Sequence, residues 1–153
     1  MYRMFLIKYA EIGVKGKNRY LFEDALVGQI KRTLKRVEGR FSVTKESGRI
    51  YVQAMGEFDY EETVEALQTV FGVVGICPVV LLEDEGYERL SEGVAAYMDR
   101  TYPDKHRSFK VQVRRARKTY PLDSMELGRM LGGDILHAFP DFSVDVHHPD
   151  ILL

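Results

Sequence analysis

Residues 40–55, Arg-Phe-Ser-Val-Thr-Lys-Glu-Ser-Gly-Arg-Ile-Tyr-Val-Gln-Ala-Met, decide the architecture of the first half of this chain of 153 residues. Two stretches rich in β-branched and aromatic residues, Arg40–Lys45 and Arg49–Met55, flank the dipeptide Ser47-Gly48. Because glycine readily adopts the backbone conformation that a tight turn needs, this pattern predicts two antiparallel strands joined as a hairpin.

The sequence on each side of this hairpin predicts one helix and one strand. Before it come an apolar strand at Met4–Tyr9 and an amphipathic helix that begins after Asn18, the predicted N-cap, and ends at Gly39. After it come a helix at Glu61–Phe71 and a strand at Ile76–Leu82. The order β-α-β-β-α-β is that of a ferredoxin-like domain, which we assign to residues 1–76.

Residues 77–153 are predicted to form a second, partial α/β domain, so the whole chain belongs to the α+β class. Its predicted elements are a helix at Tyr87–Tyr102, a strand at Ser108–Arg114, a helix at Asp123–Phe139 and a strand at Ser143–His147. The chain ends on three apolar residues, which we interpret as the start of a further strand. We therefore expect this domain to be incomplete at its C-terminus and the chain to be a piece of a longer protein.

The charge of the chain is unevenly distributed. The formal net charge is -1, but residues 1–50 carry a net +7, residues 51–104 a net -10 and residues 105–153 a net +2. Two basic blocks separated by an acidic one indicate a polyanionic partner for the blocks, although the total charge does not.

Two basic clusters are candidate phosphate-binding surfaces. Seven Lys and Arg residues and no acidic residue lie between Lys105 and Lys118, and Tyr120 adds an aromatic ring on which a base could stack. The other cluster precedes the N-terminus of a predicted helix, where free N–H groups favour anions. The candidate contacts are Lys110, Arg114, Arg115, Arg117, Lys118 and Tyr120 in the first cluster, and Lys15, Lys17 and Arg19 in the second. A solvated basic edge that deters aggregation is the alternative interpretation of the first cluster.

Several function classes are excluded or disfavoured. The single cysteine excludes an internal disulfide and a thiolate zinc cluster, and the four histidines lack ligand spacing, so we predict no metal site. No apolar run is long enough to cross a bilayer, which indicates a cytoplasmic protein without a membrane partner. No nucleophile–base pattern is evident, so we predict no catalytic residue.

Gly128, Gly132 and Gly133 interrupt the last predicted helix. They serve either close packing of this helix or the approach of a nucleic-acid backbone.

Three segments resemble one family. Residues 8–19, Lys-Tyr-Ala-Glu-Ile-Gly-Val-Lys-Gly-Lys-Asn-Arg, closely resemble the opening signature of the tRNA 4-thiouridine synthetases, the tRNA sulfurtransferases that are also linked to thiamine biosynthesis. Residues 109–135 and residues 144–150 resemble the THUMP domain of the same family. Ala10 departs from the Gly or Ser that family members commonly carry there.

This resemblance implies a ferredoxin-like domain followed by a THUMP domain, which together bind tRNA. In such enzymes a further domain uses ATP and Mg²⁺ to adenylate uridine 8 of tRNA, and a persulfide then delivers the sulfur. This chain carries no Ser-Gly-Gly-x-Asp-Ser motif, so we expect it to need no cofactor of its own and to be inactive alone in ATP–pyrophosphate exchange. A cysteine desulfurase or a sulfur carrier is a candidate partner of the full-length enzyme.

Two other functions are compatible with the sequence. The chain could be an adaptor whose acidic middle segment docks a protein, or the THUMP part of another tRNA-modifying enzyme. The tRNA-binding interpretation makes one further prediction: replacing Arg114 and Arg115 together by Glu weakens tRNA binding and leaves thermal stability nearly unchanged. The sequence leaves open which tRNAs bind and whether the chain dimerises.

Overall fold

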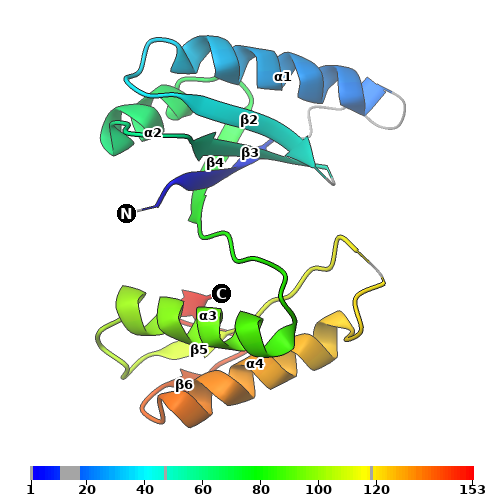
Figure 1. Ribbon diagram of the computed structural model, residues 1–153, viewed down its shortest axis with the longest axis vertical. Helices are drawn as coiled ribbons and strands as arrows, with labels where there is room; N and C mark the ends of the chain where they lie inside the picture. Colours follow the sequence, from blue (N-terminus) through cyan, green and yellow to red (C-terminus); the bar gives the residue numbers. More distant parts are fainter. Residues whose placement is uncertain (1, 11–17, 47, 118) are drawn as a thin grey trace. The chain divides into compact units, whose positions relative to one another are not determined.

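The chain folds into two units that each combine helices with a sheet (Figure 1). The residues that the computed structural model describes are 2–10, 18–46, 48–117 and 119–153. Backbone contacts divide the chain into Met1–Leu81 and Leu82–Leu153, which we call the first and the second unit. The predicted α+β class is confirmed. Within the described residues, no helix is long and apolar enough to cross a membrane.

The first unit has the predicted ferredoxin-like order of elements. Its elements are β1 (Met4–Tyr9), α1 (Arg19–Leu34), β2 (Phe41–Glu46), β3 (Arg49–Ala54), α2 (Tyr60–Gln68) and β4 (Val73–Val79). The four strands form one antiparallel sheet in the order β2-β3-β1-β4. The hairpin β2–β3 is the one predicted from residues 40–55, and Val43 lies opposite Val52 in it.

The core of the first unit lies between one face of the sheet and both helices (Figure 1). Alternate residues of the strands point to this face, because side chains of a strand alternate between its two sides. The buried apolar residues include Phe5, Ile7, Ile50 and Val52 from the sheet and Leu26, Ile30, Leu34 and Leu67 from the helices. Burying a side chain of this size contributes about 1.5–3 kcal/mol, so this contact holds the unit together.

Helix α1 ends earlier than the sequence predicts. It runs to Leu34, and the chain then turns before it enters β2. Gly39 lies in this turn with a φ of +130°, and a Cβ atom there would lie only 2.8 Å from the Cβ of Phe58. Gly39 is therefore needed for the turn rather than for capping the helix. Asn18 does precede the helix, but its side chain makes no capping hydrogen bond.

Strand β4 begins and ends three residues before the predicted strand at 76–82. Its register is set by β1, because Met4 lies opposite Val79 and Ile7 opposite Ile76. The apolar run continues beyond the strand, so hydrophobicity alone did not mark its end. The expected domain boundary after residue 76 falls inside β4, whereas the contacts divide the chain between Leu81 and Leu82.

The second unit places two helices on a small sheet. Its elements are α3 (Tyr87–Thr101), β5 (Ser108–Lys110), α4 (Ser124–Ala138), β6 (Ser143–Val144) and β7 (Ile151–Leu152). The strands are parallel and lie in the order β6-β5-β7. A buried cluster of Met98, Phe109, Ile135, Phe142 and Ile151 joins both helices to the sheet. The predicted helices are confirmed, and Asp123 caps α4 by accepting a hydrogen bond from the Glu126 amide at 2.7 Å.

Strand β5 is shorter than predicted. The alternating pattern of residues 108–114 predicted a strand to Arg114, but β5 ends at Lys110. Its neighbours β6 and β7 each provide only two residues, and among the described residues the last cross-strand backbone bond is from the amide of Gln112 to the oxygen of Leu153, at 2.8 Å. Residues 113–117 are consequently an irregular loop rather than part of the sheet.

A polar contact joins the two helices of the second unit. The hydroxyl of Tyr87 donates a hydrogen bond to Oδ2 of Asp134, and the hydroxyl of Ser91 donates to the same atom at 2.7 Å. These bonds, that of Tyr87 first, lower the pKa of Asp134 below its usual value of 3.8. Burial, followed by the bond to Asp134, raises the pKa of Tyr87 to about 12. Both hydrogen bonds to Asp134 therefore form at full strength when Asp134 is ionised and Tyr87 is protonated.

Replacing Asp134 by Asn is expected to flatten the acid limb of the stability profile. The depressed pKa of Asp134 in the folded state means that its stabilisation is present above its unfolded pKa, near 4, and is lost as the pH falls below that value. At pH 7 the variant should lose about 1 kcal/mol or less, because the contact is exposed to solvent. Thermal unfolding followed by circular dichroism between pH 2.5 and 7 measures both effects. Parallel profiles for the variant and the wild type would contradict this role.

Candidate nucleic-acid interface

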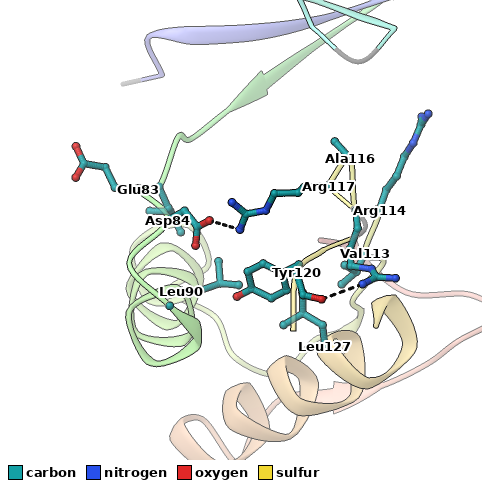
Figure 2. A pocket seen from close by; sticks show the side chains of 12 residues that line it. Glu83, Asp84, Leu90, Val113, Arg114, Ala116, Arg117, Tyr120 and Leu127 are labelled. Atoms are coloured by element: carbon teal, nitrogen blue, oxygen red, sulfur yellow. Dashed lines mark hydrogen bonds and ion pairs between the residues drawn. The ribbon is translucent and has the colours of Figure 1, made fainter. Parts of the chain in front are cut away.

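The loop after β5 gathers most of the candidate phosphate-binding residues in the second unit. Described candidates from this cluster are Lys110, Arg114, Arg115, Arg117 and Tyr120. Lys118 lies outside the described residues, so nothing is assigned to it from the structure. Apart from Lys110, all of these described candidates line a hollow of about 350 Å³ (Figure 2).

Arg115 is bound to the chain itself. Its Nη1 atom donates to the backbone oxygens of Tyr120 at 3.2 Å and of Leu122 at 3.0 Å, and the residue is half-buried. Hydrogen bonds from a charged donor are among the stronger ones in proteins. Arg115 therefore ties the backbone at Tyr120 and Leu122 to its own part of the loop, and the phosphate contact expected from the sequence stays a prediction.

Arg117 is paired with an acidic residue from the start of the unit. Its Nη2 atom lies 2.7 Å from Oδ2 of Asp84, and both side chains are exposed (Figure 2). The guanidinium carbon also lies 5.8 Å from the centre of the Tyr120 ring, a distance typical of a cation–π contact. Arg117 thus contacts both the Asp84 carboxylate and the Tyr120 ring at the border of the hollow.

Tyr120 contributes its ring to the hollow. The ring points toward Leu90 of α3, and Leu127 of α4 and Val113 of the loop line the same space (Figure 2). The residue is half-buried, so part of the ring is open to solvent. An apolar hollow with an aromatic ring and an arginine at its border could accept a planar, uncharged group beside a phosphate.

Among the described arginines of the loop, Arg114 is the one without an internal hydrogen bond or ion pair. Its side chain extends away from the hollow into solvent (Figure 2). Within the described part of the chain it makes no hydrogen bond and no ion pair. An exposed guanidinium without an internal partner can bind phosphate without first losing another contact.

Lys110 borders a second hollow, of about 590 Å³, between α4 and the edge of the sheet. Arg129 of α4 lines it too, together with the exposed side chains of Met125 and Val146. The sequence analysis missed Arg129, although its spacing of four residues from Met125 places both on one face of the helix. Lys110 and Arg129 make no ion pair with any described residue.

The glycines of α4 line the second hollow as well. A Cβ atom at Gly128 would lie 3.6 Å from the Val111 oxygen, and one at Gly132 would lie 4.0 Å from a methyl group of Val111. These are ordinary contact distances, and a Cβ at Gly133 would meet nothing within 4 Å. Close packing of α4 on the sheet therefore does not require glycine at these positions.

The second basic cluster lies in the first unit and is described only in part. Lys15 and Lys17 lie outside the described residues. Arg19 donates from Nε to Oε1 of Glu23 at 2.9 Å, and the Glu23 side chain is only 6% exposed. Hydrogen bonds to Tyr9 and then to Glu23 raise the pKa of Arg19. Arg19 thus neutralises a buried carboxylate, so its availability for RNA is lower than the sequence suggested.

No metal centre is evident among the residues that the structure describes, since no three His, Cys, Asp or Glu side chains gather in a way that could hold an ion. The described side chains that line the first hollow include arginines, an aromatic ring and apolar groups.

Two family models match the chain, one in each unit. The model of the ThiI ferredoxin-like domain matches residues 4–77, and the model of the THUMP domain matches residues 85–153. The probable tRNA sulfurtransferases of Lachnospira eligens and Agathobacter rectalis are 58% and 56% identical over 153 residues, which is 100% of this chain and 39% of each relative. The chain thus spans about two fifths of the length of these relatives.

Two solved structures resemble the fold. PH1313 from Pyrococcus horikoshii Ot3 superposes with a TM-score of 0.82 at 28% identity, covering 98% of this chain and 49% of that one. A 4-thiouridine synthetase, solved as an RNA complex with bound ATP, superposes with a TM-score of 0.77 at 29% identity, covering 100% of this chain and 38% of that one.

Proposed function

The chain belongs to the tRNA sulfurtransferase (ThiI) family, with its ferredoxin-like and THUMP domains, and from this membership we propose that it binds tRNA for the formation of 4-thiouridine. The proposed role is substrate recognition in the cytoplasm, where tRNA is the ligand and uridine 8 is the nucleotide to be modified.

The observation that carries this proposal is the loop 110–120 of the second unit. It places Arg114 in solvent and the half-buried Tyr120 beside Arg117, all in the THUMP domain of the chain. Phosphate contacts position an RNA and stacking on aromatic rings holds its unpaired bases. The 4-thiouridine synthetase that superposes on the whole chain was solved with RNA, which supports the same proposal.

A binding titration of the whole chain tests this function. With fluorescently labelled tRNA at 100 mM salt, we expect saturable binding with a dissociation constant of about 1 μM or lower, tighter than most non-specific binding at physiological salt. Fluorescence anisotropy gives the constant.

Competition separates tRNA recognition from general affinity for polyanions. Unlabelled tRNA should displace the labelled tRNA, and duplex DNA of equal charge should do so at least about tenfold less well, because an RNA-binding surface reads shape and 2′-hydroxyl groups. Equal competition by tRNA and DNA would show that the site binds polyanions without preference for RNA. The absence of saturable binding would contradict the proposed function.

A further inference from the structure

The segment that joins the two units is attached to the loop that we propose binds RNA. This joining segment, residues 82–86, opens the second unit and precedes α3. Asp84 of the segment forms the ion pair with Arg117 at 2.7 Å. The side chain of Leu82 lies over α3 at Gly93, where a Cβ atom would be 2.8 Å from Leu82 Cδ1. An apolar contact, the ion pair of Asp84 with Arg117 and an ion pair of Glu85 with Arg89 of α3 at 3.8 Å therefore hold the joining segment on this unit.

The ion pair is of a kind that another anion can displace. The side chains of Arg117 and Asp84 are 63% and 58% exposed, so water and dissolved anions reach both. Exposed ion pairs of this kind contribute little to stability. A guanidinium group binds a carboxylate and a phosphate through the same pairs of N–H groups, so the two anions compete for the same donors.

The charges around the pair make joint occupancy unfavourable. Glu83 and Glu85 flank Asp84 in the sequence, but the Glu83 side chain points away from Arg117 (Figure 2), so the carboxylate beside a phosphate at Arg117 would be that of Asp84. Like charges at short distance repel, and the repulsion is relieved when the joining segment moves away from the loop. Glu85 is also near Arg89 at 3.8 Å, while Glu83 forms no ion pair with any described residue.

We propose that Asp84 competes with RNA phosphate for Arg117, so that RNA binding releases the joining segment from the second unit. The inference rests on the proposed function, because it needs RNA at the loop, but it assigns a role to a residue outside the basic clusters. Coupling between two equilibria is reciprocal: if RNA weakens the attachment of the joining segment, then loosening the segment strengthens RNA binding by the same factor.

Replacing Asp84 by Asn tests the competition. Asn keeps the size of the side chain and removes its charge, so Arg117 is available to phosphate from the start. We expect tRNA to bind about two- to fivefold more tightly, the range that an exposed ion pair supports. Glu83→Gln is the matched control, because it removes one negative charge from the adjacent residue without breaking the pair. An equal gain in both variants would show that only general repulsion matters, and weaker binding by Asp84→Asn would show that Asp84 positions Arg117 for RNA; either result overturns the proposal.

Hydrogen exchange of the wild-type chain tests the release directly. The amide of Glu85 donates to the Glu83 oxygen at 3.0 Å and that of Leu90 to the Gly86 oxygen at 3.1 Å, so peptides covering residues 82–90 report on the segment. We expect faster exchange there when tRNA is bound, and equally fast exchange in Asp84→Asn without tRNA. Slower exchange with tRNA would mean that RNA covers the segment and would overturn the release. The anisotropy titration of the wild-type chain keeps the two claims apart: no tRNA binding there contradicts the proposed function, whereas tRNA binding without faster exchange contradicts only the release.

Discussion

Raising the salt concentration from 50 to 200 mM is expected to weaken tRNA binding by several hundredfold. The expectation follows from counterion release: each neutralised phosphate adds about 0.7–0.9 to the slope of log affinity against log salt. About six phosphates give a slope of about -4 to -5. The cations counted are Lys110 and Arg114, which make no ion pair with another described residue, and Arg117, whose exposed ion pair with Asp84 a phosphate can displace. Lys15, Lys17 and Lys118, which lie outside the described residues, complete the count as sequence-based candidates.

The count of six leaves out two of the candidate cations. Arg115 and Arg19 are excluded from it, because their guanidinium groups are bound to backbone oxygens and to Glu23. Anisotropy titrations at five or more salt concentrations give the slope. A slope near zero would mean that binding does not depend on phosphate contacts and would contradict the interface. A slope beyond about -6 would mean that further cations, Arg129 among them, take part.

The hairpin could be predicted from the sequence because its information is local. Residues 40–55 contain both strands and the turn, so β2 and β3 appear nearly where the pattern placed them. The ends of β4 and β5 could not be predicted, because a strand ends where its neighbour ends. The alternation of residues 108–114 describes side chains only, whereas the length of β5 depends on β6 and β7, which come much later in the chain.

The sequence predicts which basic residues gather at the candidate site, but it does not predict which internal partner each arginine binds. The basic run from Lys105 to Lys118 is visible in the sequence, and its loop borders the hollow. The partner of Arg19 could have been found, since Glu23 follows at the i,i+4 spacing of helical ion pairs. The partners of Arg115 and Arg117 could not, because backbone oxygens in a loop and an aspartate 33 residues away leave no periodic signal.

Adjacent arginines in the loop should consequently respond in different ways to substitution. Replacing Arg114 by Glu is expected to lower tRNA affinity about tenfold or more, since it removes one phosphate contact and adds a charge that repels RNA. The salt slope should fall by about 1 in magnitude, and the melting temperature should change little, because the side chain is exposed and makes no hydrogen bond or ion pair with another described residue. Arg100→Glu, with the same change of charge at the end of α3, is the control, and its effect on affinity should be much smaller.

Replacing Arg115 by Ala should affect the fold as well as binding. The variant loses the donors to the oxygens of Tyr120 and Leu122, which we expect to cost about 2 kcal/mol in the second unit. For a unit of this size the melting temperature should fall by several degrees, and amide exchange in residues 115–122 should accelerate.

The double replacement of Arg114 and Arg115 by Glu should therefore lower both tRNA affinity and thermal stability, contrary to the sequence-based expectation of unchanged stability. If Arg115→Ala lowered tRNA affinity without changing melting temperature or loop exchange, Arg115 would be a direct phosphate contact after all. Arg115→Lys keeps the charge without the forked donor, so a positioning role predicts that it restores little of the loop order.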